Sequence, residues 1–178
     1  MSKRETNLER CRDIAKSLLR VDLRESTIPF ICSHPFTNTW ISCYNGKTLD
    51  LHNQADREIW ISALSESIDR SDILSIMCLV NSPYKLTVIK FLSPYLSDKD
   101  LGIILCGFWQ QQEQISLDRN VTGVELIKWF KRADKSSLMT ESVLKRYNAL
   151  PAKVTVYRGV TEHNKNKKKP YHGHLTAM

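Results

Sequence analysis

The stretch between residues 53 and 150 consists of short segments in which apolar residues recur every three or four positions. This spacing puts apolar side chains on one face of a helix. Residues that break or cap helices separate the segments, for example Pro83, Pro94 and Thr122. Helices this short are stable only when they bury their apolar faces against one another. The pattern therefore predicts a mostly helical body with its own hydrophobic core.

A helix and a small β region are expected before this body. The helix is predicted from Leu8 to about Val21, where apolar residues keep the helical period. Residues 28–32, 40–44 and 48–51 are predicted strands because they are rich in β-branched and aromatic side chains. Asn45 and Gly46 indicate a hairpin turn, since both central positions of a type I′ turn need positive φ. The expected fold class is therefore α+β and mainly α.

The net charge of +7 lies mostly in one stretch. Residues 153–178 contain six Lys or Arg and one acidic residue, Glu162, so they contribute +5 and residues 1–152 only +2. A lysine-rich stretch attracts phosphate without reading sequence, and no aromatic residue lies between its lysines at 164–169. We therefore do not expect nucleic acid as a specific partner.

Other simple features exclude several protein classes. No apolar run reaches the roughly 18 residues that a membrane-spanning helix needs, and residues 1–7 do not lead into the apolar segment of a signal peptide. We therefore expect no membrane association and a cytoplasmic location. The five cysteines show no C-x-x-C spacing and are expected to be buried, reduced thiols. Cys32, His34, Cys43 and His52 match no common zinc spacing, so no metal site is predicted.

A run of β-branched and aromatic residues follows Pro151. Residues 153–160 read Lys-Val-Thr-Val-Tyr-Arg-Gly-Val, which predicts a strand. The planar guanidinium of Arg158 suits phosphate or carboxylate, and Gly159 allows a ligand to approach the backbone closely. The alternative is an arginine on an edge strand whose head group reaches into solvent.

The run from Leu150 to Val160 resembles the first motif of the Arg-Ser-Glu type mono-ADP-ribosyltransferases of phages and bacteria. In that family a helical region leads through a Leu-Pro step to an aromatic-Arg-Gly strand, and residues 131–139 resemble the helical lead-in. The resemblance implies an NAD-dependent enzyme that transfers ADP-ribose to a protein acceptor. It implies that Arg158 contacts the NAD phosphate on the nicotinamide side, with Tyr157 and Gly159 beside it. It assigns no catalytic residue in this chain.

Two later motifs of that family, a Ser-x-Ser strand and a Glu-x-Glu-like turn, are not found after Val160. The Lys167–Lys169 run is typical of adenine-rich codons, in which one base is easily lost or gained. Shifting one plausible codon set for residues 170–178 by a single base gives Ala-Leu-Ser-Trp-Ser-Leu-Asp-Arg-Asn, which resembles the missing Ser-x-Ser strand. The hypothesis is a frameshift near Lys169 and a truncated enzyme that is inactive as given.

The predicted organisation has three parts. Residues 1–150 form a mostly helical domain with a small β region at about 28–51. Residues 151–160 form the first strand of an incomplete ADP-ribosyltransferase core, and residues 161–178 form a basic tail without fixed structure. The alternative is a helical protein–protein interaction module without catalytic activity, which binds its partner through residues such as Met77, Trp109 and Trp129.

Overall fold

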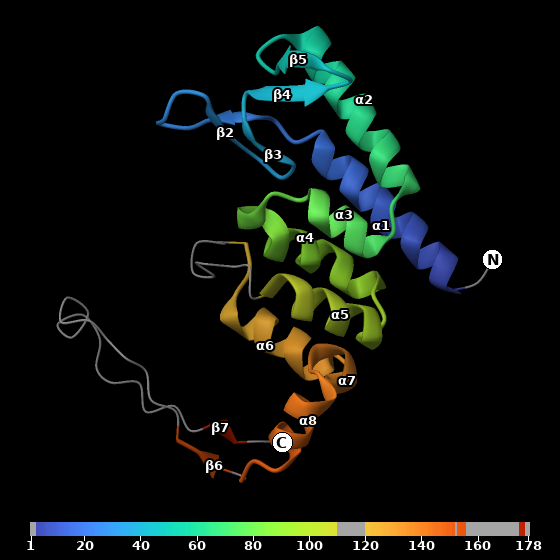
Figure 1. Ribbon diagram of the computed structural model, residues 1–178, viewed down its shortest axis with the longest axis vertical. Helices are drawn as coiled ribbons and strands as arrows, with labels where there is room; N and C mark the ends of the chain where they lie inside the picture. Colours follow the sequence, from blue (N-terminus) through green and yellow to red (C-terminus); the bar gives the residue numbers. More distant parts are fainter. Residues whose placement is uncertain (1–2, 110–119, 152, 156–174, 177–178) are drawn as a thin grey trace, which may run out of the picture. The chain divides into compact units, whose positions relative to one another are not determined.

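The computed structural model describes residues 3–109, 120–151, 153–155 and 175–176 (Figure 1). The chain divides into two compact units between Leu138 and Met139. The first unit contains a β region and most of the helices, and the described residues of the second form one helix and two short strands. The mixed, mainly helical fold class is confirmed. The boundaries at residues 150 and 160 remain predictions.

The first unit is built mostly from helices, as the sequence pattern indicates. They are α1 (Lys3–Leu19), α2 (Gln54–Arg70), α3 (Ile73–Leu79), α4 (Lys85–Leu92), α5 (Asp98–Trp109), α6 (Gly123–Arg132) and α7 (Lys135–Leu138), with short 3-10 helices η1 (Ser82–Tyr84) and η2 (Ser93–Tyr95). The one-turn helix α7 is not predicted by the apolar period, because four residues are too few to show one.

Local side-chain contacts explain where several helices begin. The Asn53 side chain accepts hydrogen bonds from two backbone N–H groups at the start of α2. Thr122 and Glu125 form a reciprocal capping box at the start of α6. The sequence suggests Ser71 as the cap of α3, but the structure shows Asp72 in this role, accepting from the Ser75 N–H at 2.7 Å. Ser71 instead ends α2.

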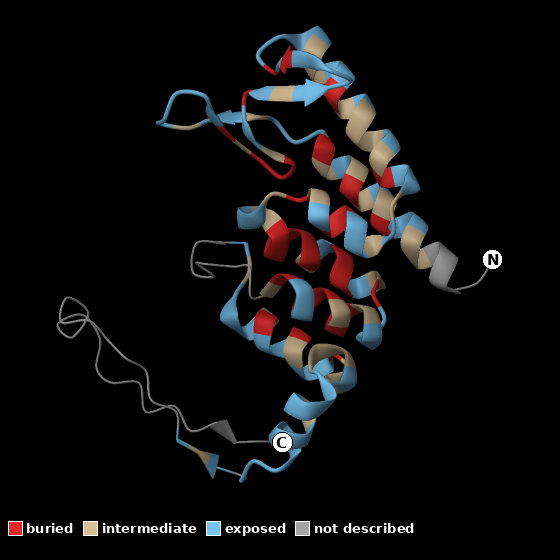
Figure 2. Ribbon diagram, viewed as in Figure 1, coloured by how far each residue is buried: buried red, intermediate tan, exposed pale blue. Residues whose placement is uncertain are grey.

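A single hydrophobic core runs through the first unit, and Figure 2 shows its buried residues on α1, α4 and α5. Helix α4 is buried at five consecutive positions from Lys85 to Ile89, so it lies inside the unit. Helix α7 contacts α5 closely at Gly102. The core also receives side chains of the β region, among them Cys32, Trp40 and Leu51. Helices and β region therefore share one core.

The β region has two small antiparallel sheets. Strands β1 (Arg24–Glu25), β2 (Ile31–His34) and β3 (Thr37–Thr39) form one, and the hairpin of β4 (Ile41–Tyr44) and β5 (Lys47–Asp50) forms the other. The φ angles of Asn45 and Gly46 are 48° and 72°, which confirms the predicted hairpin turn. The strand predicted at 28–32 is wrong in its first part. Residues 28–30 belong to a turn that precedes β2.

This turn holds an aromatic residue in an unfavourable backbone conformation. The Ile31 N–H donates to the Ile28 carbonyl at 3.2 Å, so Pro29 and Phe30 are the two central residues. Phe30 has φ of 67°, a value that favours Gly or Asn at this position of a turn. Its side chain is 77% exposed, so burial does not compensate for the strain.

We expect Phe30→Gly to be about 1 kcal/mol more stable than Phe30→Ala, because only glycine adopts positive φ without a steric penalty. In most helical or extended positions alanine is the more stable of the two. Urea denaturation of the two variants, followed by tryptophan fluorescence, measures the difference. Equal stabilities, or a more stable alanine variant, would contradict the left-handed conformation of Phe30.

The second unit contains α8 (Glu141–Asn148), β6 (Lys153–Val154) and β7 (Leu175–Thr176). Strands β6 and β7 are antiparallel, with Lys153 opposite Thr176 and Val154 opposite Leu175. Extended backbone therefore begins where the sequence predicts a strand after Pro151. Strand β7 falls within residues 161–178, for which the sequence predicts no fixed structure.

Candidate functional site

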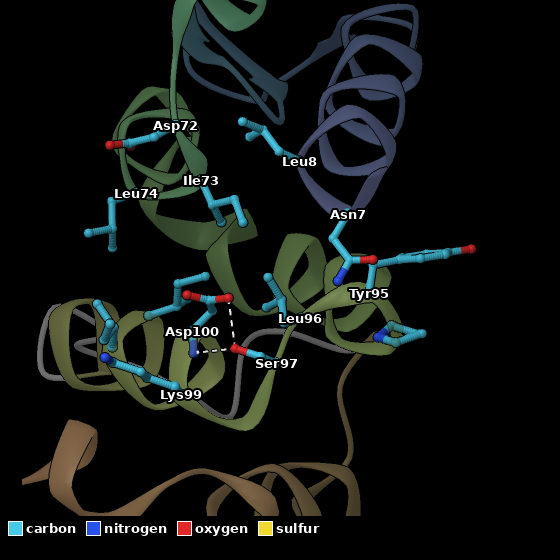
Figure 3. Close-up of a pocket in the computed structure, with 13 residues that line it drawn as sticks. Asn7, Leu8, Asp72, Ile73, Leu74, Tyr95, Leu96, Ser97, Lys99 and Asp100 are labelled. Carbon is cyan, nitrogen blue, oxygen red and sulfur yellow. Dashed lines mark hydrogen bonds between the residues drawn. The ribbon is translucent and has the colours of Figure 1, made fainter. Parts of the chain in front are cut away.

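An open groove of about 1060 Å³ lies on the first unit (Figure 3). It is bounded by the first half of α1, the beginning of α3, and the segment that runs from η2 into α5. Seven of its thirteen lining residues are aliphatic or proline: Leu8, Ile73, Leu74, Pro94, Leu96, Ile103 and Ile104. The groove therefore presents a partly apolar surface at a point where three chain segments meet.

Helix caps fix the polar groups of this groove. Asp72 lines it while capping α3. Ser97 accepts from the Asp100 N–H at 3.0 Å and donates to the Asp100 carboxylate at 2.7 Å (Figure 3). Helix α3 buries Ile76 and Met77, which leaves Leu74 41% exposed at the groove. The same local contacts that start α3 and α5 thus position two carboxylates beside an apolar wall.

The described charged side chains that line the groove are two carboxylates and one ammonium group. They belong to Asp72, Asp100 and Lys99. The pKa of Asp72 lies below its ordinary value because the Ser75 N–H donates to the carboxylate, so this group is ionised at neutral pH. Next to the groove, Arg10 lies over the Tyr95 ring, 5.4 Å from its centroid. An acidic edge beside apolar side chains suits a ligand that is both basic and apolar.

His34 is a second unusual polar group, buried in β2 with no exposed surface. Its Nδ1 atom accepts from the Phe36 N–H at 3.0 Å, and its ring lies edge-on to Trp60 at 5.2 Å. Its Nε2 atom makes no hydrogen bond within the described part of the chain. Burial lowers the pKa of His34 to about 4, although the carbonyl groups of Leu19 and Val21 favour the charged ring. His34 is therefore neutral, and its enclosure makes it a structural residue.

The four possible zinc ligands of the β region lie in different environments. Cys32 and His34 are buried in β2, whereas Cys43 on β4 is exposed. His52 stacks on Trp40 with 4.1 Å between ring centroids, and its Nδ1 lies 2.8 Å from the carboxylate of Asp50. Among the residues that the structure describes, no group of three or more His, Cys, Asp or Glu is arranged to hold a metal ion.

The cysteines differ from the prediction that all are buried. Cys11 and Cys32 are buried, but Cys43, Cys78 and Cys106 are exposed, and all five are free thiols. Burial raises the pKa of Cys11 to about 11, so this thiol is protonated and unreactive at neutral pH. The prediction failed for Cys78 and Cys106 because each helix has an outer face, and small apolar residues are tolerated there.

The structure places only some of the residues that the sequence predicts to be functional. Tyr157, Arg158 and Gly159 lie outside the described residues. Met77 and Trp129 are buried in the core, so the interpretation that they form a partner surface is wrong. Trp109 is half-buried and packs edge-on against Phe130 at 5.1 Å. Met77, Trp109 and Trp129 therefore contribute to the packing of the core.

Sequence reasoning missed the groove itself. Its lining residues come from Asn7–Leu8, Asp72–Leu74 and the stretch from Pro94 to Ile104. Each of these segments looks like an ordinary helix start with its apolar residues, and only the folded chain brings them together. A weak signal was present in Leu74, an apolar residue outside the face that Ile76 and Met77 define.

No helix within the described ranges is long and apolar enough to cross a membrane. Comparison of the chain with models of known protein families, with curated proteins and with solved structures found no match. The motif at Arg158 and the groove are the two features of the chain that point to a function.

Proposed function

We propose that the chain is related to the NAD-dependent mono-ADP-ribosyltransferases and that Arg158 contacts a phosphate of NAD. The observation that carries this proposal is the sequence from Leu150 to Val160, in which a Leu-Pro step precedes an aromatic-Arg-Gly strand. Extended backbone at Lys153–Val154 supports the strand. The helix α8 immediately before it supports the expected order of a helical lead-in followed by a strand.

The donor chemistry of this short segment fits a dinucleotide phosphate. A guanidinium group presents several N–H donors in one plane and remains charged at all physiological pH values. Gly159, next to Arg158, removes the side chain that would keep a ligand away from the backbone. In this proposal Tyr157 and Gly159 shape the site beside Arg158, NAD supplies the ADP-ribose, and a protein is the acceptor.

The coding DNA tests the proposal independently of protein folding. The nucleotide sequence shows directly whether the codons of Lys167–Lys169 are rich in adenine. It also gives the reading frame that lies one base away from the frame of residues 170–178. We expect that frame to encode a Ser-x-Ser strand and then a Glu-x-Glu-like turn.

A second candidate function is that of a helical protein–protein interaction module. The groove favours it, because the first unit already has a core yet leaves apolar side chains accessible beside α3 and α5. A groove with apolar lining is a place where the apolar face of a partner helix can dock. This function is compatible with the first, since the helical region of a transferase can bind a partner while the core carries the chemistry.

A further inference from the structure

We infer that the groove between α1, α3 and α5 binds a basic amphipathic helix of a partner protein. This inference rests on the interaction function proposed above and names the kind of partner that the groove fits. Leucine-like side chains of the partner helix lie against the apolar wall, and its Lys or Arg side chains face the carboxylates at the edge.

The size and lining of the groove favour a peptide over a small molecule. Its volume of about 1060 Å³ lies just above the roughly 300–1,000 Å³ typical of small-ligand pockets, and the groove is open to solvent. Leu96 and Ile104 are almost fully buried beneath it, while Leu74 is 41% exposed at its side. A buried apolar floor with an exposed apolar wall is the arrangement that receives the apolar face of a helix.

The charged side chains in and beside the groove favour a partner helix with positive charge. Asp72 and Asp100 line the groove, and Glu9 and Asp13 line a hollow that shares Asn7 and Tyr95 with it. None of these four carboxylates forms a salt bridge with another described residue. Among the residues whose side chains the structure describes, the cations that line the two hollows are Lys99 and Arg10.

This local excess of acid lies on a part of the chain that is nearly neutral, because residues 1–152 contribute only +2 of the net charge. A basic segment is attracted to such an acidic region, and charge complementarity of this kind steers a partner toward one surface. RNA and anionic lipid carry phosphates, which the carboxylates repel. A basic amphipathic segment of a protein is therefore the occupant that agrees with both the apolar wall and its acidic edge.

The probe is a 14-residue amphipathic helix made only of leucine and lysine, with a leucine–glutamate peptide of the same pattern as its control. Binding to the full chain is followed by fluorescence anisotropy of the labelled peptide. We expect the lysine peptide to bind at least about tenfold more tightly than the glutamate peptide, and this ratio to shrink as salt is added.

Two substitutions test whether binding occurs in the groove. Leu74→Arg places a cation and a larger side chain on the exposed wall, and we expect it to weaken binding of the lysine peptide about tenfold or more. Asp72→Asn keeps a good helix cap while removing one negative charge, and we expect a smaller loss. Ile59→Arg is the matched control, because Ile59 is similarly exposed (45%) but lies on α2 outside the groove.

Several results would overturn the inference. If Leu74→Arg and Ile59→Arg have the same effect, the peptide binds elsewhere, and an interaction function would need another surface. If both peptides bind equally, the acidic edge does not select the partner. If neither binds at up to about 1 mM, the groove is not a helix-binding site. Circular dichroism of each variant separates loss of binding from loss of folding.

Discussion

Gly102→Ala is expected to lower the free energy of unfolding by about 2 kcal/mol, although alanine normally stabilises a helix. A Cβ atom at position 102 would lie 2.8 Å from the Cβ of Ser137 and 2.9 Å from the carbonyl oxygen of Asp134. Both atoms belong to the segment around α7, which cannot move away easily because the Asp134 N–H donates to the Asp98 carbonyl. The added methyl group therefore separates α7 from α5.

The same substitution at Gly107, later in α5, is the internal control. Gly107 is exposed, and no atom of another described part of the chain lies within 4 Å of the place where its Cβ would be. Gly107→Ala is therefore expected to raise the free energy of unfolding by up to about 1 kcal/mol. Urea denaturation followed by tryptophan fluorescence measures both variants, because all four tryptophans lie in the first unit. Similar effects of the two substitutions would contradict the close contact of α5 and α7.

His34 is expected to make the first unit sensitive to mild acid. Its pKa is about 4 in the folded chain, against an ordinary value of 6.5. The unfolded chain therefore binds a proton between pH 6.5 and 4 that the folded chain does not, so stability falls as the pH decreases through this window. Between pH 7.5 and pH 5 this one group is expected to remove about 2 kcal/mol from the free energy of unfolding.

His34→Asn isolates this contribution. The asparagine oxygen can accept from the Phe36 N–H as Nδ1 does, but the side chain does not titrate. We expect the variant to lose about 2 kcal/mol less than the unmodified chain between pH 7.5 and pH 5. A hydrogen bond from Lys90 is the main cause that lowers the pKa of Glu125 to about 2. Glu125 is present in both proteins, so its contribution to the pH dependence of stability is the same in both. An equal loss of stability in both would show that His34 is not enclosed.

The sequence pattern was sufficient for features that depend on neighbouring residues. The helical period located most helices of the first unit, and the turn at Asn45–Gly46 followed from the need for positive φ. The capping residue Thr122 was found because its contacts lie within one helical turn.

Features that depend on contacts between residues far apart in the sequence could not be predicted from local patterns. The apolar run at 28–32 looks like one strand, but Pro29 and Phe30 turn the chain before β2. His34 gave no sign of complete burial, which depends on α1 and on Trp60 in α2. The groove joins side chains from α1, α3 and α5, and no local pattern links these segments.

The most direct test of the proposed relation to ADP-ribosyltransferases is the coding nucleotide sequence. It should be determined from the codon of Lys165 to the codons beyond Met178. We predict adenine-rich codons at Lys167–Lys169 and, one base out of register, an open frame that encodes Ser-x-Ser and later a Glu-x-Glu-like turn. Stop codons in both alternative frames, or an open frame without these motifs, would contradict it.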